Sequence, residues 1–224
     1  MKNLRAALIA GLVFAAGCQP ANATEEKVVL TPAAAVTAHE TGRQTAIFSG
    51  GCFWGVEGVF SHTKGVTSAI SGYQGGSKAD ANYETVSTGK TGHAESVKVT
   101  YDPKVVRYDQ LLRIFFSVIA DPTQLNYQGP DHGTQYRSAL VPLTPEQKKV
   151  AAAYLAQLKK SGVWGSTIVT RIEPYKGFYP AEAHHQDFME RNPNQGYITY
   201  WDVPKVQAMQ KLFPSLYSPT FKTG

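Results

Sequence analysis

The sequence predicts an α+β fold, and two kinds of pattern lead to that prediction. Short stretches in which apolar and polar residues alternate are typical of half-buried strands, and longer stretches with apolar residues three and four positions apart are typical of helices. The 224 residues include 42% hydrophobic and 17% charged residues, an ordinary composition for a soluble protein with a sizeable core. Because no repeat and no Pro/Ser linker interrupts residues 44–200, we expect one domain, 44–224, with N-terminal extensions.

The first elements of this domain surround a pair of glycines. Residues 44–49 are predicted to form a strand, Gly50 and Gly51 then turn the chain, and a short helix begins at "CFWGVEGVF". Residues 66–73 follow as a second strand. The connection 74–93 is rich in Gly, Ser and Asn and is long for a compact domain, which itself suggests a function.

The stretch "AESVKVTY" alternates clearly and predicts a third strand with two different faces. One face carries Glu95, Val97, Val99 and Tyr101, and the other, which we expect to face water, carries Ser96, Lys98 and Thr100. Residues 108–119 have the apolar spacing of a helix, and residues 136–141 are predicted to form a fourth strand. The order β-α-β-β-α-β is that of a ferredoxin-like core.

Additional elements follow this core. Thr144 is expected to cap a helix that has Pro145 at its first position and ends before Gly162. A strand over 167–172 and a helix over 181–190 complete the predicted α+β domain, and a long C-terminal coil follows them.

Residues 1–23 have the features of a secretory signal peptide. Lys2 and Arg5 precede an apolar run that is too short to cross a bilayer and is followed by small residues. The cleavage point is ambiguous: "AAGC" resembles a bacterial lipoprotein box that would place a lipid on Cys18, whereas "ANA" fits ordinary cleavage after Ala23. We therefore expect export to the bacterial cell envelope, the periplasm, either lipid-anchored at Cys18 or as a soluble secreted form.

The residues that follow the leader are polar and rich in Ala, Thr and Pro. Residues 24–43 are predicted to be a flexible tether, because they offer little to bury. Without the two basic residues of the leader the formal charge of +5 falls to +3. The remaining basic residues are scattered, so the sequence gives no support to a nucleic-acid partner.

Cys52 has the sequence context of a nucleophile. The glycines before it permit a tight turn and the close approach of another molecule. A helix that begins at Cys52 directs its free N–H groups at the sulfur, which is expected to lower the pKa of the thiol. The alternative is that Cys52 is a small buried apolar residue, as unpaired cysteines often are.

Glu95 is expected to point into the core, because the alternation places it on the face of Val97 and Val99. A carboxyl group in that position must either pair with a basic side chain or keep its proton, since burial raises its pKa. A protonated glutamic acid near a thiolate would place a proton donor beside a nucleophile. The alternative is an ion pair with a basic residue elsewhere in the chain.

Three longer stretches carry these residues: "GGCFWGVEGVF", "NYETVSTGKTGHAESVKVTYDP" and "DHGTQYRSAL". In order and spacing they resemble the motifs of the peptide methionine sulfoxide reductase A family, over roughly residues 45–200. The resemblance implies an oxidoreductase that reduces protein-bound and free methionine-(S)-sulfoxide to methionine, repairs oxidised proteins and needs no metal or organic cofactor.

The resemblance also implies a role for each matching residue. Cys52 would attack the sulfoxide sulfur and become a sulfenic acid, and Glu95 would donate a proton to the sulfoxide oxygen. The other roles are hydrogen bonds to that oxygen (Tyr83, Tyr136), organisation of the polar network (Asp131), and an apolar wall around the S-methyl group (Phe53, Trp54). Phe53 and Trp54 could instead be ordinary core residues, and the two tyrosines could be surface or strand residues.

The sequence departs from the family in how the enzyme would be recycled. Many relatives carry a resolving cysteine after the Gly-Tyr of a segment like "NPNQGYITYWD", but here Ile198 follows Tyr197 and no cysteine follows Cys52. We therefore expect an external thiol reductant, thioredoxin or similar. We also expect a monomeric enzyme. An aromatic-rich C-terminal region is expected to pack over the site; its members are Phe178, Tyr179, Tyr197, Tyr200 and Trp201.

Two functions of other classes remain as alternatives. A cysteine hydrolase would pair Cys52 with a histidine base such as His93 or His184. A non-catalytic envelope adaptor would keep the fold and need no thiol. The histidines do not predict a metal site, because neighbours such as His184 and His185 point in different directions on a helix and no second thiol completes a ligand set; His93 and His132 are the others considered.

Overall fold

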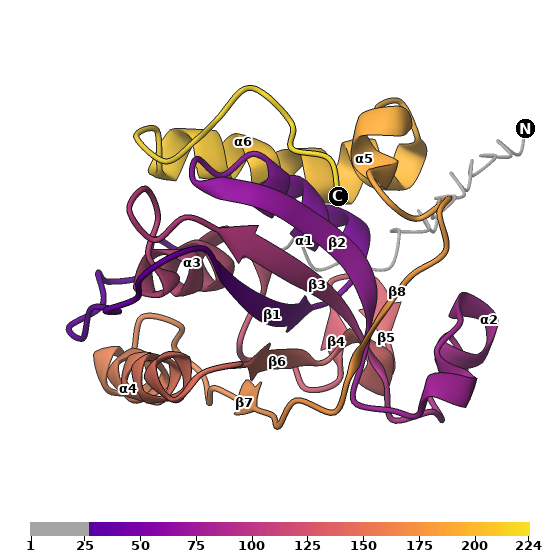
Figure 1. Ribbon diagram of the computed structural model, residues 1–224, viewed down its shortest axis with the longest axis horizontal. Helices are drawn as coiled ribbons and strands as arrows, with labels where there is room; N and C mark the ends of the chain where they lie inside the picture. The colour runs from indigo at the N-terminus through magenta and orange to yellow at the C-terminus, as the bar shows by residue number, and fades with distance from the viewer. Residues whose placement is uncertain (1–26) are drawn as a thin grey trace, which may run out of the picture.

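The computed structural model describes residues 27–224, in which one six-stranded sheet has the strand order β7-β6-β1-β3-β2-β8 (Figure 1). Its four central strands are β1 (Gln44–Gly50), β2 (Val66–Gln74), β3 (Ala94–Tyr101) and β6 (Ser138–Val141). β3 is antiparallel to β1 and β2, and β1 is antiparallel to β6. α1 (Phe53–Ser61) connects β1 to β2, and α3 (Tyr108–Ile114) lies between β3 and β6. The predicted β-α-β-β-α-β core is confirmed.

Short strands extend the sheet at both edges. β7 (Arg171–Ile172) is parallel to β6, and β8 (Phe178–Pro180) is antiparallel to β2. A separate two-stranded ribbon consists of β4 (Tyr127–Gln128) and β5 (Asp131–His132). The strand predicted over 167–172 is therefore mostly absent. The residues before β7 make other bonds: Val169 N–H donates to Pro122 O (2.7 Å), and the Thr170 hydroxyl lies 2.8 Å from that of Ser138.

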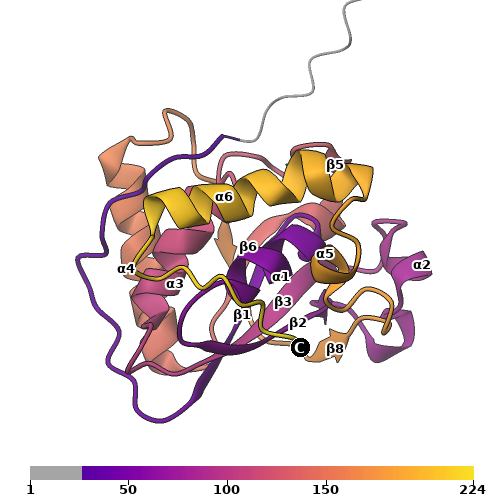
Figure 2. The same ribbon diagram turned by 90° about the horizontal axis from the view of Figure 1, so that it is seen from above.

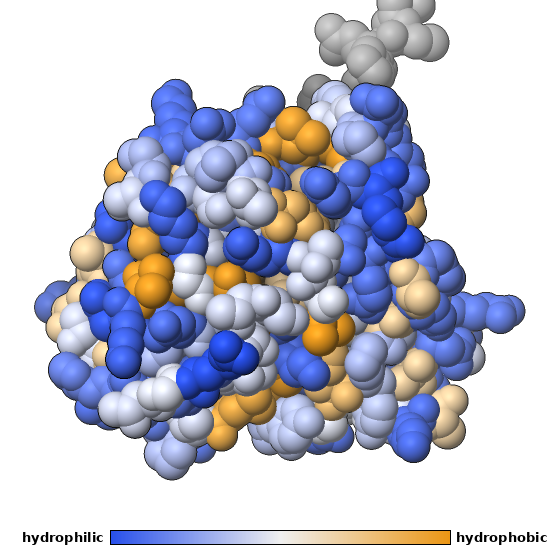
Figure 3. Space-filling model, turned by 45° about the horizontal axis from the view of Figure 1, so that its top comes forward, coloured by the Kyte–Doolittle hydropathy of each residue, from blue (hydrophilic) through white to orange (hydrophobic). Residues whose placement is uncertain are grey.

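Helices cover one face of the sheet in two layers. α1 packs on β2 and β3, and α6 (Val203–Leu212) runs across α1 (Figure 2). α3 packs against α4 (Pro145–Ser161). In the core between the sheet and its helices, the ring of Phe48 on β1 lies 4.8 Å from that of Phe60 on α1 and 5.5 Å from that of Phe115. The surface over α5 and α6 is mainly hydrophilic, with small separate apolar patches (Figure 3).

The helix predicted over 108–119 has the expected length but changes its winding. α3 continues as a π-helical turn, η2 (Phe115–Ile119), in which Ala120 N–H donates to Phe115 O (3.0 Å). This turn directs Phe115 onto the end of β1, where a Cβ at Gly50 would lie 2.7 Å from the ring. Gly50 is therefore required by packing against η2.

α4 begins and ends as the sequence predicts. The Thr144 hydroxyl accepts a hydrogen bond from Gln147 N–H (3.1 Å), Pro145 occupies the first turn, and Gly162 ends the helix at φ 64°. These local signals were sufficient because none of them depends on the rest of the fold.

The polar face of β3 is open to water only in part: Lys98 and Thr100 are partly exposed as expected, but Ser96 is not. Ser96 is fully buried, and its hydroxyl lies 2.7 Å from that of Ser49 on β1. β3 is a central strand with neighbours on both sides, and the two hydroxyls satisfy each other, so Ser96 can lie inside.

The helix predicted over 181–190 is also wrong. Only α5 (Phe188–Arg191) is helical, and the residues before it form turns that end at Asp187, whose φ is 52°. Ala181 N–H donates to Ser71 O (2.9 Å) and continues the edge pairing of β8. Asp187 N–H donates to the buried Glu57 carboxyl group (2.9 Å). Contacts to α1 and β2 therefore override the helical pattern.

The tether prediction fails for the described residues 27–43. This segment crosses α3 and α4 (Figure 2), and both Thr31 and Ala38 are buried. The Thr31 hydroxyl lies 2.9 Å from that of Tyr154, and Ala38 N–H donates to Asp109 (2.9 Å). Specific hydrogen bonds compensate for the low hydrophobicity of the segment. The predicted signal peptide and Cys18 lie outside the described residues.

The C-terminal region contains more helix than the predicted coil. A π-helical turn, η4 (Ile198–Asp202), leads into α6. The last residues then run along the end of α1, where Lys64 N–H donates to Leu216 O (2.7 Å) and Ser218 N–H to His62 O (2.7 Å). Within the described part of the chain, no helix is both long and apolar enough to span a membrane.

Candidate active site

Two glycines place Cys52 at the start of α1. Gly51 has φ 89°, a conformation that glycine adopts without strain, and a Cβ there would lie 2.6 Å from Gln128. The turn leaves Cys52 at the N-cap of α1, where it is 9% exposed. The sulfur is therefore buried beside the first turn of a helix.

Cys52 lines a cavity of about 160 Å³. The other lining residues are Phe53, Trp54, Tyr83, Glu95, Asp131, Tyr136 and Tyr197. All seven residues singled out from the sequence are thus brought together, from α1, α2 (Tyr83–Val86), β3, β5 and the 3₁₀ turn η3 (Thr134–Tyr136). Tyr136 precedes β6 and does not belong to it, contrary to the strand predicted from 136. The roles of the seven residues stay predictions.

Glu95 faces the cavity from β3 and is 2% exposed. Its Oε2 accepts a hydrogen bond from Phe53 N–H (2.9 Å). The pKa of the carboxyl group is raised to about 8; burial is the main cause, the Phe53 hydrogen bond opposes the shift, and the charges of Asp131 and Asp202 add to it. No ion pair involves Glu95 among residues 27–224, so the alternative of a basic partner has no support there. At neutral pH this group mostly keeps its proton.

The pKa of the Cys52 thiol is raised, contrary to the expectation from the helix terminus. Burial is the main cause, and the charges of Glu95, Asp202 and Asp131 add to it. The hydrogen bond from the Trp54 backbone lowers the pKa but does not compensate. In the unliganded protein the sulfur is a thiol, and a thiolate must form when the substrate arrives.

Asp131 and Tyr197 form a polar pair on one side of the cavity. The Tyr197 hydroxyl donates a short hydrogen bond to the Asp131 carboxylate. Burial raises the pKa of Asp131, while this bond and the charge of Lys205 oppose the shift. Behind the pair, Lys205 Nζ lies 3.5 Å from the buried Asp202 carboxylate. Lys205 thus partly balances the acidic side chains near the thiol.

Tyr83 of α2 and Tyr136 of η3 line the same cavity. Burial raises the pKa of both, and the charge of Glu95 acts in the same direction. Both hydroxyls are therefore protonated at neutral pH and able to donate a hydrogen bond. A ligand oxygen near Glu95 could accept from all three groups.

Aromatic rings wall the cavity. The Trp54 ring stacks on that of Phe188 (centroids 3.8 Å apart), and its Nε1–H donates to His185 Nδ1 (3.2 Å). The Tyr197 ring meets Trp54 edge-on at 5.8 Å. This is an apolar slot with one polar end, as small-molecule sites usually have.

Sequence reasoning gave Tyr197 only as one member of an aromatic region. That region divides in the structure: Tyr197 lines the site, Phe178 and Tyr179 lie on β8, and Tyr200 and Trp201 line a different cavity of about 660 Å³. The larger cavity contains no cysteine among its lining residues. His185, considered earlier only as a metal ligand, packs against Tyr83 with ring centroids 4.4 Å apart.

The histidines proposed for a hydrolase do not line the cavity of Cys52. His93 is buried elsewhere: its Nε2 lies 2.8 Å from Ser77 O, and its Nδ1 accepts from Gly76 N–H (3.2 Å). Both ring nitrogens are used by the backbone, which leaves no free base. Over residues 27–224, no group of three or more His, Cys, Asp or Glu side chains is arranged to hold a metal ion.

The family model of peptide methionine sulfoxide reductase matches residues 44–216, which include every residue of this cavity. The chain belongs to this family. Peptide methionine sulfoxide reductase MsrA 2 of Mesorhizobium japonicum is 59% identical over 177 residues, which are 79% of this chain and 91% of that protein. The protein of the same name from Synechocystis is 49% identical over 77% of this chain and 80% of its own length.

Solved structures of the family have the same fold. Reduced Mxr1 of Saccharomyces cerevisiae matches with a TM-score of 0.61 and 34% identity, over 72% of this chain and 92% of that chain. Methionine sulfoxide reductase A of Corynebacterium diphtheriae matches with a TM-score of 0.59 and 34% identity, over 70% and 78%. The chain is therefore an oxidoreductase, a peptide methionine sulfoxide reductase.

Proposed function

We propose that the protein reduces methionine-(S)-sulfoxide, both free and within polypeptides, with Cys52 as the nucleophile. The observation that carries the proposal is one small cavity in which the Cys52 thiol meets a buried Glu95 carboxyl group that holds its proton up to about pH 8. A sulfoxide needs both: a nucleophile for its sulfur and an acid for its oxygen.

The sulfoxide oxygen would lie at the polar end of the slot, where Glu95, Tyr83 and Tyr136 can each donate a hydrogen bond. Proton transfer from Glu95 to this oxygen places positive charge on the substrate sulfur. That charge lies beside Cys52 and lowers the pKa of the thiol, which overcomes the effect of burial. The thiolate then forms only when a substrate is present.

The reaction balances within this site. Cys52 attacks the sulfoxide sulfur, so an S–S bond forms, the S–O bond breaks and the protonated oxygen leaves as hydroxide. Hydroxide or water then attacks the Cys52 sulfur and the S–S bond breaks, which releases methionine and leaves Cys52 as a sulfenic acid. The substrate sulfur gains two electrons and Cys52 loses two, and the thiol proton returns to Glu95. Because the electrons come from the cysteine, the step needs no metal or organic cofactor.

The aromatic wall would hold the substrate's S-methyl group. Phe53, Trp54 and Tyr197 contribute aromatic surface to the cavity, to which Glu95, Tyr83 and Tyr136 contribute polar groups. A sulfoxide sulfur is chiral, so only one epimer can direct its oxygen and its methyl group to the correct ends at once. This argument supports selectivity for one epimer, and membership of the family supports the S-epimer as that one. The site is complete within one chain, consistent with a monomeric enzyme.

An external thiol would regenerate the enzyme. The sequence has no cysteine from 53 to 224, and the position after Tyr197 is the buried Ile198 of η4. A thioredoxin-like dithiol protein or a small thiol would attack the sulfenic acid. We further propose that the leader, residues 1–23, exports the enzyme to the cell envelope, with or without a lipid on Cys18; the mass of the mature N-terminus tests this.

The test of the activity is Cys52→Ser assayed with each epimer separately. The native protein should convert the S-epimer to methionine and leave the R-epimer unchanged, and Cys52→Ser should lose all turnover while keeping the fold. Substantial turnover by the variant would refute the mechanism. Hydrolysis of a thioester or peptide bond by the native protein, without methionine formation, would favour a cysteine hydrolase.

A further inference from the structure

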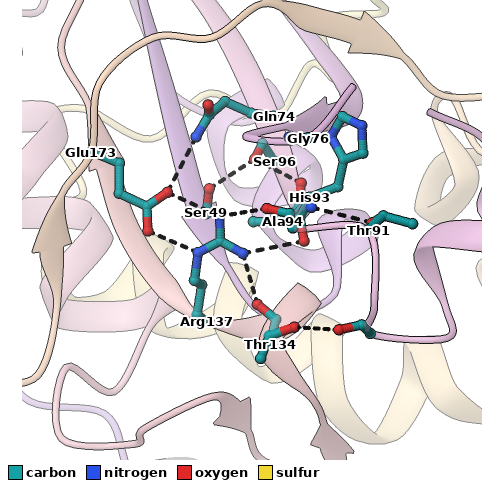
Figure 4. A network of polar contacts seen from close by, with 12 residues as sticks. Ser49, Gln74, Gly76, Thr91, His93, Ala94, Ser96, Thr134, Arg137 and Glu173 are labelled. Carbon is teal, nitrogen blue, oxygen red and sulfur yellow. Dashed lines mark hydrogen bonds and ion pairs between the residues drawn. The ribbon is translucent and has the colours of Figure 1, made fainter. Parts of the chain in front are cut away.

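Arg137, the residue after Tyr136, is the centre of a polar network behind the cavity (Figure 4). Its side chain is 14% exposed, and it forms an ion pair with Glu173 through Nε at 2.8 Å and Nη2 at 2.9 Å. Although burial raises the pKa of Glu173, the bonds and charge of Arg137 hold it below the ordinary value. The Glu173 carboxyl group is therefore charged at neutral pH.

The remaining N–H groups of Arg137 bind three backbone carbonyls. Nη1 donates to His93 O (3.1 Å) and Thr134 O (2.9 Å), and Nη2 donates to Gly92 O (3.2 Å). A guanidinium group has five N–H donors in a fixed plane, and all five are used here. An arginine that is fully bonded in this way fixes the distances between the segments that it touches.

These segments carry two of the residues proposed for the reaction. Thr134 belongs to η3, whose last residue is Tyr136, and Gly92 and His93 lead into β3, whose second residue is Glu95. η3 has only three residues and cannot hold a position by itself. The Thr134 hydroxyl also donates to Gly89 O (2.8 Å), a second contact that holds η3 beside the chain that leads into β3.

We propose that Arg137, oriented by Glu173, is a positioning residue that holds the Tyr136 hydroxyl and the Glu95 carboxyl group at a fixed separation across the cavity. The inference rests on the proposed function. Neither Arg137 nor Glu173 lines the cavity, so they act through Tyr136 and Glu95 and do not touch the substrate. Lysine could keep the charge of Arg137 but has three donors on one atom and cannot span the same carbonyls.

The chain offers a matched control. Arg107 also forms a two-bond ion pair, with Asp109 (both bonds 2.9 Å), at the start of α3 and outside the cavity. Arg137→Lys and Arg107→Lys therefore make the same chemical change at two buried or partly buried pairs. Displacing a reacting group by about 1 Å can cost about 100-fold in rate. We expect Arg137→Lys to slow single-turnover reduction by about 10- to 100-fold with little change in KM, and Arg107→Lys to leave the rate within about twofold.

A double-mutant cycle separates positioning from loss of stability. If Arg137 acts through Tyr136, then Tyr136→Phe should slow the native protein much more than it slows Arg137→Lys. Independent effects that multiply, or an Arg137→Lys rate equal to that of Arg107→Lys, would overturn the inference. If Arg137→Lys does not fold, Glu173→Gln replaces it in the cycle: Tyr136→Phe should then slow the native protein much more than it slows Glu173→Gln. A native protein without turnover would refute the proposed function and this inference together, whereas an active native protein with multiplying effects refutes this inference alone.

Discussion

A backbone hydrogen bond connects the acid of the site, Glu95, to the residue that follows the nucleophile, Cys52. Phe53 N–H donates to the Glu95 carboxyl group, so the residue next to the thiol orients the proton donor. The Gly-Gly turn and the alternation of β3 were sufficient to predict that both groups face one site. The raised pKa of the thiol could not be predicted from sequence, because its main cause is burial by distant elements, to which the charges of Glu95, Asp202 and Asp131 add.

Replacing Glu95 by Gln tests its role as the acid. The amide keeps the shape but cannot protonate the sulfoxide oxygen, so the chemical step should slow by about 100-fold or more. The native carboxyl group loses its proton as the pH rises through about 8. The ratio of the native to the variant single-turnover rate should therefore fall above that pH. Equal rates would mean that a tyrosine or water supplies the proton.

Among the elements, α1 is held in place by the buried carboxyl group of Glu57, which does not line the cavity. Glu57 is buried and accepts hydrogen bonds from Asp187 N–H (2.9 Å) and Ser71 N–H (3.3 Å). It thus ties α1 to β2 and to the turn before α5, which carries the Phe188 ring stacked on Trp54. Strongly periodic elements such as α4 are predictable from sequence. The turn before α5 is not, because its hydrogen bond to the buried Glu57 decides its shape.

Glu57→Gln should change how stability depends on pH. Burial, together with the charge of Asp187, raises the pKa of Glu57 from 4.5 to about 8. The folded protein keeps this proton in a range where the unfolded chain releases it, so the free energy of unfolding falls as the pH rises from about 4.5 to about 8. The loss is at most about 5 kcal/mol.

Urea unfolding of the native protein and the variant at several pH values measures this slope. Glu95 contributes in the same direction, so Glu57→Gln should reduce the slope without abolishing it. Glu84→Gln, which removes an exposed carboxylate of α2, is the matched control and should leave the slope unchanged. The same slope in the native protein and in Glu57→Gln would contradict the assignment.

For the whole molecule, the sequence predicted the core but not how its ends are held. Residues 27–43 lack the apolar periodicity of a packed element, yet their backbone N–H groups donate to side chains of α3, η2 and α4, which no local pattern reveals. The aromatic C-terminal region shows the same limit. Only the folded chain decides that Tyr197 turns toward the site and Tyr200 toward solvent, where it is 64% exposed.

One turnover without reductant should leave a sulfenic acid on Cys52 and release one equivalent of methionine. The absence of a cysteine from 53 to 224 means that no thiol in that part of the chain can close a disulfide with Cys52. A dimedone-type probe should therefore trap the intermediate, and small thiols or a dithiol protein should restore activity. A Cys18–Cys52 disulfide detected by mass in the mature protein would refute this prediction and exclude a lipid on Cys18.

The packed N-terminal segment also limits how far the enzyme could move from a membrane. If Cys18 carried a lipid, residues 19–28 would connect it to the folded part of the enzyme, because Val29 N–H already donates to Ser117 O of η2. Ten residues reach at most about 34 Å, whereas the 25 residues from 19 to 43 would reach about 85 Å. An enzyme anchored in this way would then stay within roughly one protein diameter of the bilayer.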